Sequence, residues 1–271
     1  MNKIIRLFAL LAAATMLVTA CSKEEEENSE NSGFQGRHIK KVAEVYYMYE
    51  GEIVRVDTVV SNYVWDGNQL SHINHSGTIY ERYNLSFTKT SLNFKTQYYY
   101  RDNKVAAIFY RRIGSTMTTT YDEFSWQGDK IRMRNNYQFE YKDGKLHSQF
   151  DDYDTLSYVW EGDDIAVLDH SFLLGIITEY RCSYDNNTNP FYGLMNPAFH
   201  ENSEVTPDLY FLSWNKNNVT RIEIDFVNTG YDPTIIEVDY QYDASGYPVK
   251  AVYTNKSNNR VLFERSIEYA D

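Results

Sequence analysis

Short stretches in which hydrophobic and polar residues alternate recur along most of the chain. Ile222, Ile224 and Phe226 are separated by single acidic residues. The same two-residue period runs through 137–142 and 236–243. This period is typical of strands that place one face on a core and the other in water, as antiparallel sheets do. The pattern therefore predicts an all-β, antiparallel fold.

A second pattern separates these stretches. An aromatic residue is followed by turn-forming residues, a polar residue and an aliphatic one, as expected for a tight hairpin whose flanking side chains pair across the strands. The motif occurs at Trp65–Leu70, Tyr100–Val105, Trp126–Ile131, Tyr141–Leu146, Trp160–Ile165, Trp214–Val219 and, in a longer form, Tyr242–Val249. Its spacing is uneven, which excludes a solenoid of fixed period. We expect a meander of about a dozen or more strands forming a curved sheet or a barrel-like body.

The amino-acid composition supports a β fold and narrows the classes of molecule that the protein could bind. Aromatic residues make up 16% of the chain, with 25 tyrosines, and such side chains suit a pleated, half-buried surface. Because 38 acidic residues outnumber 26 basic ones, the net charge of −12 argues against nucleic-acid binding. With Cys21 lipidated, as argued next, Cys182 has no partner for an intramolecular disulfide.

The N-terminus has the pattern of a lipoprotein signal. Lys3 and Arg6 precede an apolar segment, Leu7 to Val18, that is too short to span a bilayer, which needs about 20 apolar residues. Thr19 and Ala20 then lead into Cys21, as in a lipobox. We predict a signal peptide over 1–20, acylation of Cys21, a flexible acidic tether over 21–36 and one β domain over 37–271.

The residues after Cys21 indicate a location. Ser22 directly follows the cysteine, which favours the outer membrane over the inner one. The run Lys23 to Glu27 resembles the Lys-then-acidic export signal of Bacteroidetes surface lipoproteins. We therefore expect an outer-membrane, surface-facing protein whose membrane partner is reached through the lipid on Cys21.

Three segments suggest a family. Tyr184–Leu194, Asn217–Thr220 and Tyr240–Lys250 resemble an uncharacterised family of Bacteroidetes lipoproteins described as having a porin-like fold. The resemblance implies a curved antiparallel sheet or barrel-like body and no particular activity. Charge on most strands and the ending Glu-Tyr-Ala-Asp271 argue against a barrel that crosses the membrane itself, so we expect a soluble barrel.

The chain carries no phosphate loop, nucleophile elbow or His-Glu-x-x-His motif. His72 and His75 lie three apart, which places them on opposite faces of a strand. Acidic residues between Asp151 and Asp169 are compatible with a solvated hairpin, a calcium site or a pair of glycosidase carboxylates. We predict no metal, no cofactor and no enzymatic activity, with a glycoside hydrolase as the less favoured alternative.

Aromatic residues supply the candidate ligand contacts. The runs Tyr46–Tyr47 and Tyr98–Tyr100 must place some rings outside the core, where they could stack on sugars. The proline-rich loop over 185–207 adds further rings. The candidate residues are Tyr47, Tyr99, Phe191, Tyr192 and Phe199. We expect a binding module for a glycan or another extracellular ligand; the alternative is a structural or partner-docking subunit of an outer-membrane complex.

Overall fold

The computed structural model describes residues 36–50, 53–83, 86–114, 120–172, 175, 177–195, 213–227 and 229–271. Cys21 and Phe199, which the sequence singles out, lie outside these ranges. The chain divides into two units, Met1–Gly33 and Phe34–Asp271, and all described residues belong to the second. The signal peptide and tether therefore stay predictions.

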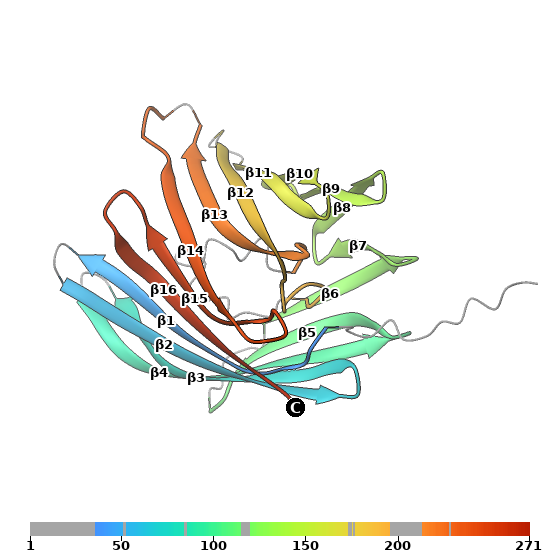
Figure 1. Cartoon of the computed structure of the whole chain (residues 1–271). Helices are drawn as coiled ribbons and strands as arrows, with labels where there is room; N and C mark the ends of the chain where they lie inside the picture. The colour runs from blue at the N-terminus through green and yellow to red at the C-terminus, as the bar shows by residue number, and fades with distance from the viewer. Residues whose placement is uncertain are drawn as a thin grey trace, which may run out of the picture. The chain divides into compact units, whose positions relative to one another are not determined.

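The described ranges form a closed antiparallel barrel of sixteen strands (Figure 1). Each strand pairs with its neighbours in the sequence, and β1 pairs with β16. The strands are β1 (Ile39–Glu50), β2 (Ile53–Asp66), β3 (Gln69–Tyr83), β4 (Ser86–Arg101), β5 (Lys104–Arg112), β6 (Thr120–Gln127), β7 (Lys130–Arg134), β8 (Tyr137–Lys142), β9 (Lys145–Phe150), β10 (Asp154–Glu161), β11 (Asp164–Phe172), β12 (Ile177–Thr188), β13 (Asn217–Phe226), β14 (Thr234–Tyr242), β15 (Pro248–Asn255) and β16 (Arg260–Tyr269). The prediction of an all-β antiparallel meander is confirmed. Within these ranges, no helix is long and apolar enough to cross a membrane.

The hairpin motif marks six of the turns between consecutive strands. In the turn between β4 and β5, Asp102 and Asn103 adopt φ angles of 51° and 60°, as a tight hairpin turn requires. The seventh motif, Trp214–Val219, was expected to form a hairpin, and that expectation is wrong. Its first residues form a turn that leads into β13, and Trp214 packs against the core, with its ring 6.4 Å from that of Phe139.

Closure of the barrel separates an inner face from an outer face. Val42 lies opposite Ile267, and Tyr46 lies opposite Phe263, where β1 meets β16. Residues that share a face with these pairs are mostly apolar and buried, and they form three core clusters. Several of the largest inward side chains have no exposed surface at all, among them those of Tyr46, Tyr253 and Phe263. Water is therefore excluded around them, and this part of the interior is a packed core.

A segment after β12 contributes to the filling of the interior. We call residues Asn189–Met195 the core plug. Phe191 and Leu194 are buried among inward side chains of the first core cluster. The Tyr98 hydroxyl donates a hydrogen bond of 3.0 Å to the carbonyl of Met195, which fixes the end of the plug to β4. The chain leaves the sheet at the end of β12, and the plug returns it to the core.

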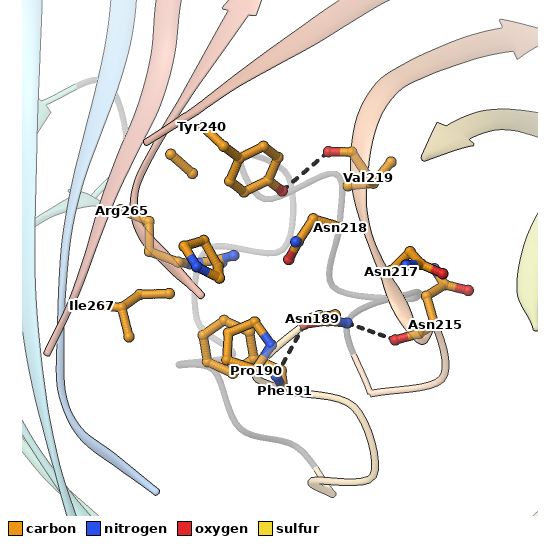
Figure 2. Close-up of a pocket in the computed structure, with 12 residues that line it drawn as sticks. Asn189, Pro190, Phe191, Asn215, Asn217, Asn218, Val219, Tyr240, Arg265 and Ile267 are labelled. Carbon is orange, nitrogen blue, oxygen red and sulfur yellow. Dashed lines mark hydrogen bonds between the residues drawn. The ribbon is translucent and has the colours of Figure 1, made fainter. Parts of the chain in front are cut away.

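A buried ion pair lies beside the core plug. The Arg265 Nε donates to Oε1 of Glu44 at 2.9 Å, and the two side chains are only 3% and 2% exposed. The Tyr46 hydroxyl donates to the other carboxylate oxygen at 2.8 Å. The guanidinium also lies 5.1 Å from the centre of the Phe191 ring, a cation–π distance. This pair therefore links β1, β16 and the plug; Figure 2 shows its Arg265 member together with Phe191 of the plug.

The outer face carries ionised side chains on many strands. Lys250 on β15 bonds Glu264 on β16 at 2.8 Å, and Lys41 on β1 bonds Glu268 at 2.7 Å. On a lipid-facing surface a lysine or arginine at the bilayer midplane costs about 2–4 kcal/mol. These positions therefore suit contact with water.

The buried ion pair gives a test of this description. We expect Glu44→Leu to lower the free energy of unfolding by about 3–5 kcal/mol, because Arg265 would stay buried without its countercharge. Adding Arg265→Met should restore most of that loss, since both charges are then absent. Urea unfolding of the barrel followed by circular dichroism measures both values. A loss below about 1 kcal/mol in the single variant would contradict a buried pair.

Candidate functional site

Three aromatic rings lie side by side on the outer face of β4, β5 and β6. The Tyr99 ring meets that of Phe109 edge-on, with centroids 5.0 Å apart. The Phe109 ring stacks on that of Tyr121 at 5.4 Å. Tyr99 and Tyr121 are 52% and 47% exposed. We call these three residues the outer platform; it presents a continuous aromatic surface to solvent, of the kind that can stack on a sugar ring.

Strand register explains why the rings gather. Tyr99 lies opposite Ala107, whose small side chain leaves space for the Tyr99 ring to lean toward Phe109 on the diagonal. Phe109 lies directly opposite Tyr121 on the other side. The neighbours Tyr98 and Ile108 point inward and are buried. Alternation along the strands therefore forces these rings outward.

Two cations adjoin the outer platform. Lys95 on β4 and Arg111 on β5 are direct cross-strand partners, and Gln97 lies opposite Phe109 in the next row. Together with Tyr99, these four residues line an open hollow of about 260 Å³. That volume is close to the roughly 300 Å³ at which small-molecule sites begin. The hollow thus combines aromatic, amide and cationic groups.

The two cations of this hollow lie next to each other on the outer face. In the described part of the chain, neither Lys95 nor Arg111 forms an ion pair with a carboxylate, although the chain has 38 acidic residues. His72 on β3 lies opposite Gln97. Partial burial, and then the positive charge of Lys95, hold the pKa of His72 below its ordinary value of 6.5. Lys95 thus lies close enough to His72 to act on its protonation.

Tyr47, also predicted as a ligand contact, lies elsewhere on the outer face. It belongs to β1, and β2 and β3 separate it from Tyr99. Its hydroxyl donates to Glu264 at 2.8 Å. That bond is the main cause of a raised Tyr47 pKa, and it helps Lys250 to lower the pKa of Glu264. The Tyr47 side chain is thus engaged in a cross-strand cluster.

The other predicted aromatic contacts separate as well. Phe191 is 2% exposed and belongs to the core plug, whereas its neighbour Tyr192 is 47% exposed. Phe199 lies outside the described ranges. The structure thus brings neither Phe191 nor Tyr192 to the outer platform, and the roles of all three residues as ligand contacts stay predictions.

The outer platform and the hollow beside it include residues that the sequence did not predict as ligand contacts: Phe109, Tyr121, Lys95 and Arg111. The turn Asp102–Asn103 alone would not have found them, because the register of β4 against β5 shifts between Tyr99 and Tyr100. Beyond that irregularity Gln97 lies opposite Phe109, and Lys95 lies opposite Arg111.

A cavity inside the barrel adjoins the core plug (Figure 2). Its volume is about 20 Å³. Its lining includes Arg265 and Ile267 from β16, Val219 from β13 and Phe191 from the plug. A water molecule needs roughly 10–15 Å³. The cavity therefore has room for about one water and none for a sugar.

The remaining candidate residues are dispersed. His75 points inward and bonds Ser61 and Thr96 at 2.7 and 2.9 Å, while His72 points outward. Of the acidic residues between 151 and 169, Asp154 bonds the buried His170 at 2.6 Å. Asp164 lies at the other end of the β10–β11 hairpin. The described residues include no group of three or more potential metal ligands.

Two solved structures resemble the barrel. One is a porin-like protein from Bacteroides uniformis ATCC 8492, with a TM-score of 0.48 and 9% identity over 88% of this chain and 100% of that one. The other is a porin-like protein from Bacteroides vulgatus ATCC 8482, with a TM-score of 0.33 and 12% identity over 86% and 99%. No protein-family model and no curated protein matches the chain. Membership of the lipoprotein family suggested by the sequence stays a prediction.

The repulsion between the two cations can be tested. We expect Lys95→Gln to raise the free energy of unfolding by about 0.2–1 kcal/mol, because like charges directly opposite each other destabilise a sheet. Lys250→Gln, which removes an outer-face lysine that is ion-paired, should not raise it. Urea unfolding compares the two variants. A loss of stability in Lys95→Gln would show that Lys95 has a stabilising partner.

The same variant should change the titration of His72. The folded-state pKa lies below 6.5, so the unfolded chain takes up the proton first as the pH falls. The contribution of His72 to stability is therefore full above pH 6.5 and declines as the pH drops through the folded-state pKa. Without the Lys95 charge the His72 pKa should rise, and NMR titration of the imidazole measures that rise. An unchanged pKa would mean that Lys95 does not act on His72.

Proposed function

We propose that this chain is a lipid-tethered barrel at the outer membrane that binds polysaccharide through the outer platform. The observation that carries the proposal is the row of Tyr99, Phe109 and Tyr121 rings on the outer face, beside a hollow of about 260 Å³. Exposed aromatic rings are costly in water, and an exposed ring such as that of Tyr99 can stack on the apolar face of a sugar. The tether from Cys21 would hold that surface next to extracellular polymers.

Two features favour binding outside the barrel over transport through it. The inward side chains of many strands are buried, and the cavity beside the core plug has room for about one water. Ion pairs such as Lys250–Glu264 suit an outer face in water rather than in lipid. We also propose that the protein faces the outside of the cell, on the basis of the residues that follow Cys21.

We propose no catalytic role. The closest carboxylate–imidazole contact, between Asp154 and His170, faces the interior, where His170 is buried. A polymer lying on the outer platform would be separated from that contact by the wall of the barrel. The carboxylates between 151 and 169 are also spread along their hairpin, whereas glycoside hydrolysis needs two carboxylates about 5–10 Å apart that flank the scissile bond.

The outer platform predicts a specific loss of binding. The fragment 34–271 contains both strands that close the barrel, so it can be tested alone. Tyr99→Ala should weaken binding to whichever members of a polysaccharide panel the fragment recognises by about fivefold, since one aromatic contact contributes roughly 1 kcal/mol. Phe109→Ala should have a similar effect. Isothermal titration calorimetry measures both.

The matched control is Tyr231→Ala. Tyr231 is 77% exposed and lies in the turn before β14, away from the outer platform. Its loss should leave affinity unchanged. If a well-folded fragment binds no polysaccharide, or if Tyr99→Ala binds as tightly as the native fragment, the proposal fails. Capture of an outer-membrane protein that Tyr99→Ala abolishes would assign the same rings to the partner-docking alternative.

A further inference from the structure

The Lys95–Arg111 contact has a cost that nothing within the described chain offsets. The two side chains lie directly opposite each other on the outer face. Like charges in that position destabilise a sheet by some tenths of a kcal/mol. Elsewhere on the same face some lysines are paired, as Lys250 is with Glu264 and Lys256 is with Glu237, each at 2.8 Å. A chain with 38 acidic residues thus leaves two adjacent cations without a carboxylate.

We propose that the polymer bound by the outer platform is an acidic polysaccharide, with a carboxylate or sulfate group held between Lys95 and Arg111. This inference rests on the proposed function. An anion placed between the two side chains would convert their mutual repulsion into two charge-assisted contacts. Arginine can also engage a carboxylate or sulfate through two parallel N–H groups.

The position of the cations relative to the rings supports the same ligand. Lys95 and Tyr99 are on one strand and share a face, and Gln97 lies between them on that face. Successive outward positions on a strand are about 7 Å apart. A sugar stacked on Tyr99 or Phe109 could therefore place an acidic substituent, its own or its neighbour's, at the cations. The Gln97 side chain lies between, where sugar hydroxyls would be.

Net charge does not oppose this assignment at short range. The chain as a whole carries −12, which repels a polyanion at a distance. Screening at physiological ionic strength has a length of about 8 Å, so contacts within the hollow respond mainly to the nearest charges. Two cations suit a polymer with sparse acidic groups. A nucleic acid, with a phosphate at every nucleotide, would need a longer basic track.

The experiment compares three polymers with one backbone: dextran, carboxymethyl-dextran and dextran sulfate of equal length. We expect at least one acidic form to bind fragment 34–271 roughly five- to tenfold more tightly than dextran in low salt, and the difference to shrink as salt is added. The double variant Lys95→Gln/Arg111→Gln should abolish that difference. The carboxymethyl and sulfate arms identify which acidic group is preferred.

The control is Lys250→Gln/Lys256→Gln, which removes the same charge from the same face and should keep the preference. Equal binding of all three polymers, or a preference that survives Lys95→Gln/Arg111→Gln, overturns the inference. Failure of the two proposals is distinguishable: Tyr99→Ala should weaken all recognised polymers alike, whereas the cation variant should affect the acidic ones only. If the acidic dextrans do not bind at all, the cation assignment fails whatever the neutral panel shows.

His72 supplies a readout that does not depend on affinity. It lies opposite Gln97, and its pKa already responds to the charge of Lys95. A bound anion should raise the His72 pKa in NMR titrations, and neutral dextran should not. A polymer that gains affinity without moving this pKa binds away from the hollow, which also overturns the inference.

Discussion

Pairing of the first and last strands closes the sheet into a barrel and gives it an inner and an outer face. At this seam Val42 lies opposite Ile267, and Tyr46 lies opposite Phe263. The rest of the structure depends on this closure. Because side chains alternate along a strand, each residue is assigned to the core or to solvent by its place in the register, and a slip of one residue would exchange the two sets. The buried Glu44–Arg265 pair crosses the same seam, so the closure is both apolar and ionic.

A barrel of sixteen strands has a wide interior that the side chains of its wall do not fill by themselves. Membrane barrels of 16–18 strands leave an aqueous channel when their walls alone define the interior. Here large inward rings, such as those of Tyr253 and Phe263, occupy space next to the wall, and the core plug brings Phe191 into it. The polarity of such a channel is largely inverted here: most buried inward side chains are apolar, apart from pairs such as Glu44–Arg265, and ion pairs such as Lys250–Glu264 face outward.

Local chemistry made much of this fold predictable. Alternation over 236–243 and turns such as Asp102–Asn103 indicate strands and hairpins without knowledge of their partners. Closure of the barrel was harder to predict from the sequence. β1 and β16 are separated by nearly the whole length of the chain, and no local pattern encodes their pairing. For the same reason, the sequence could suggest that Phe191 and Tyr192 were both available to a ligand, whereas tertiary packing buries one and exposes the other. Tyr99 was predictable from the run of three tyrosines, but its neighbours depend on cross-strand register.

The outer platform lies beside two adjacent cations of like charge. Elsewhere on the outer face some charges are neutralised in pairs, as Lys250 is by Glu264, and some rings are engaged, as Tyr47 is with Glu264. Around Tyr99, two rings are exposed, and Lys95 lies opposite Arg111 with no carboxylate paired to either in the described part of the chain. Each of these two features costs stability, and neither is needed to close or fill the barrel. The described cavity beside the core plug has little room for a ligand. The surface around Tyr99 is locally unfavourable on its own and complementary to an acidic polymer. Binding therefore explains its composition better than folding does.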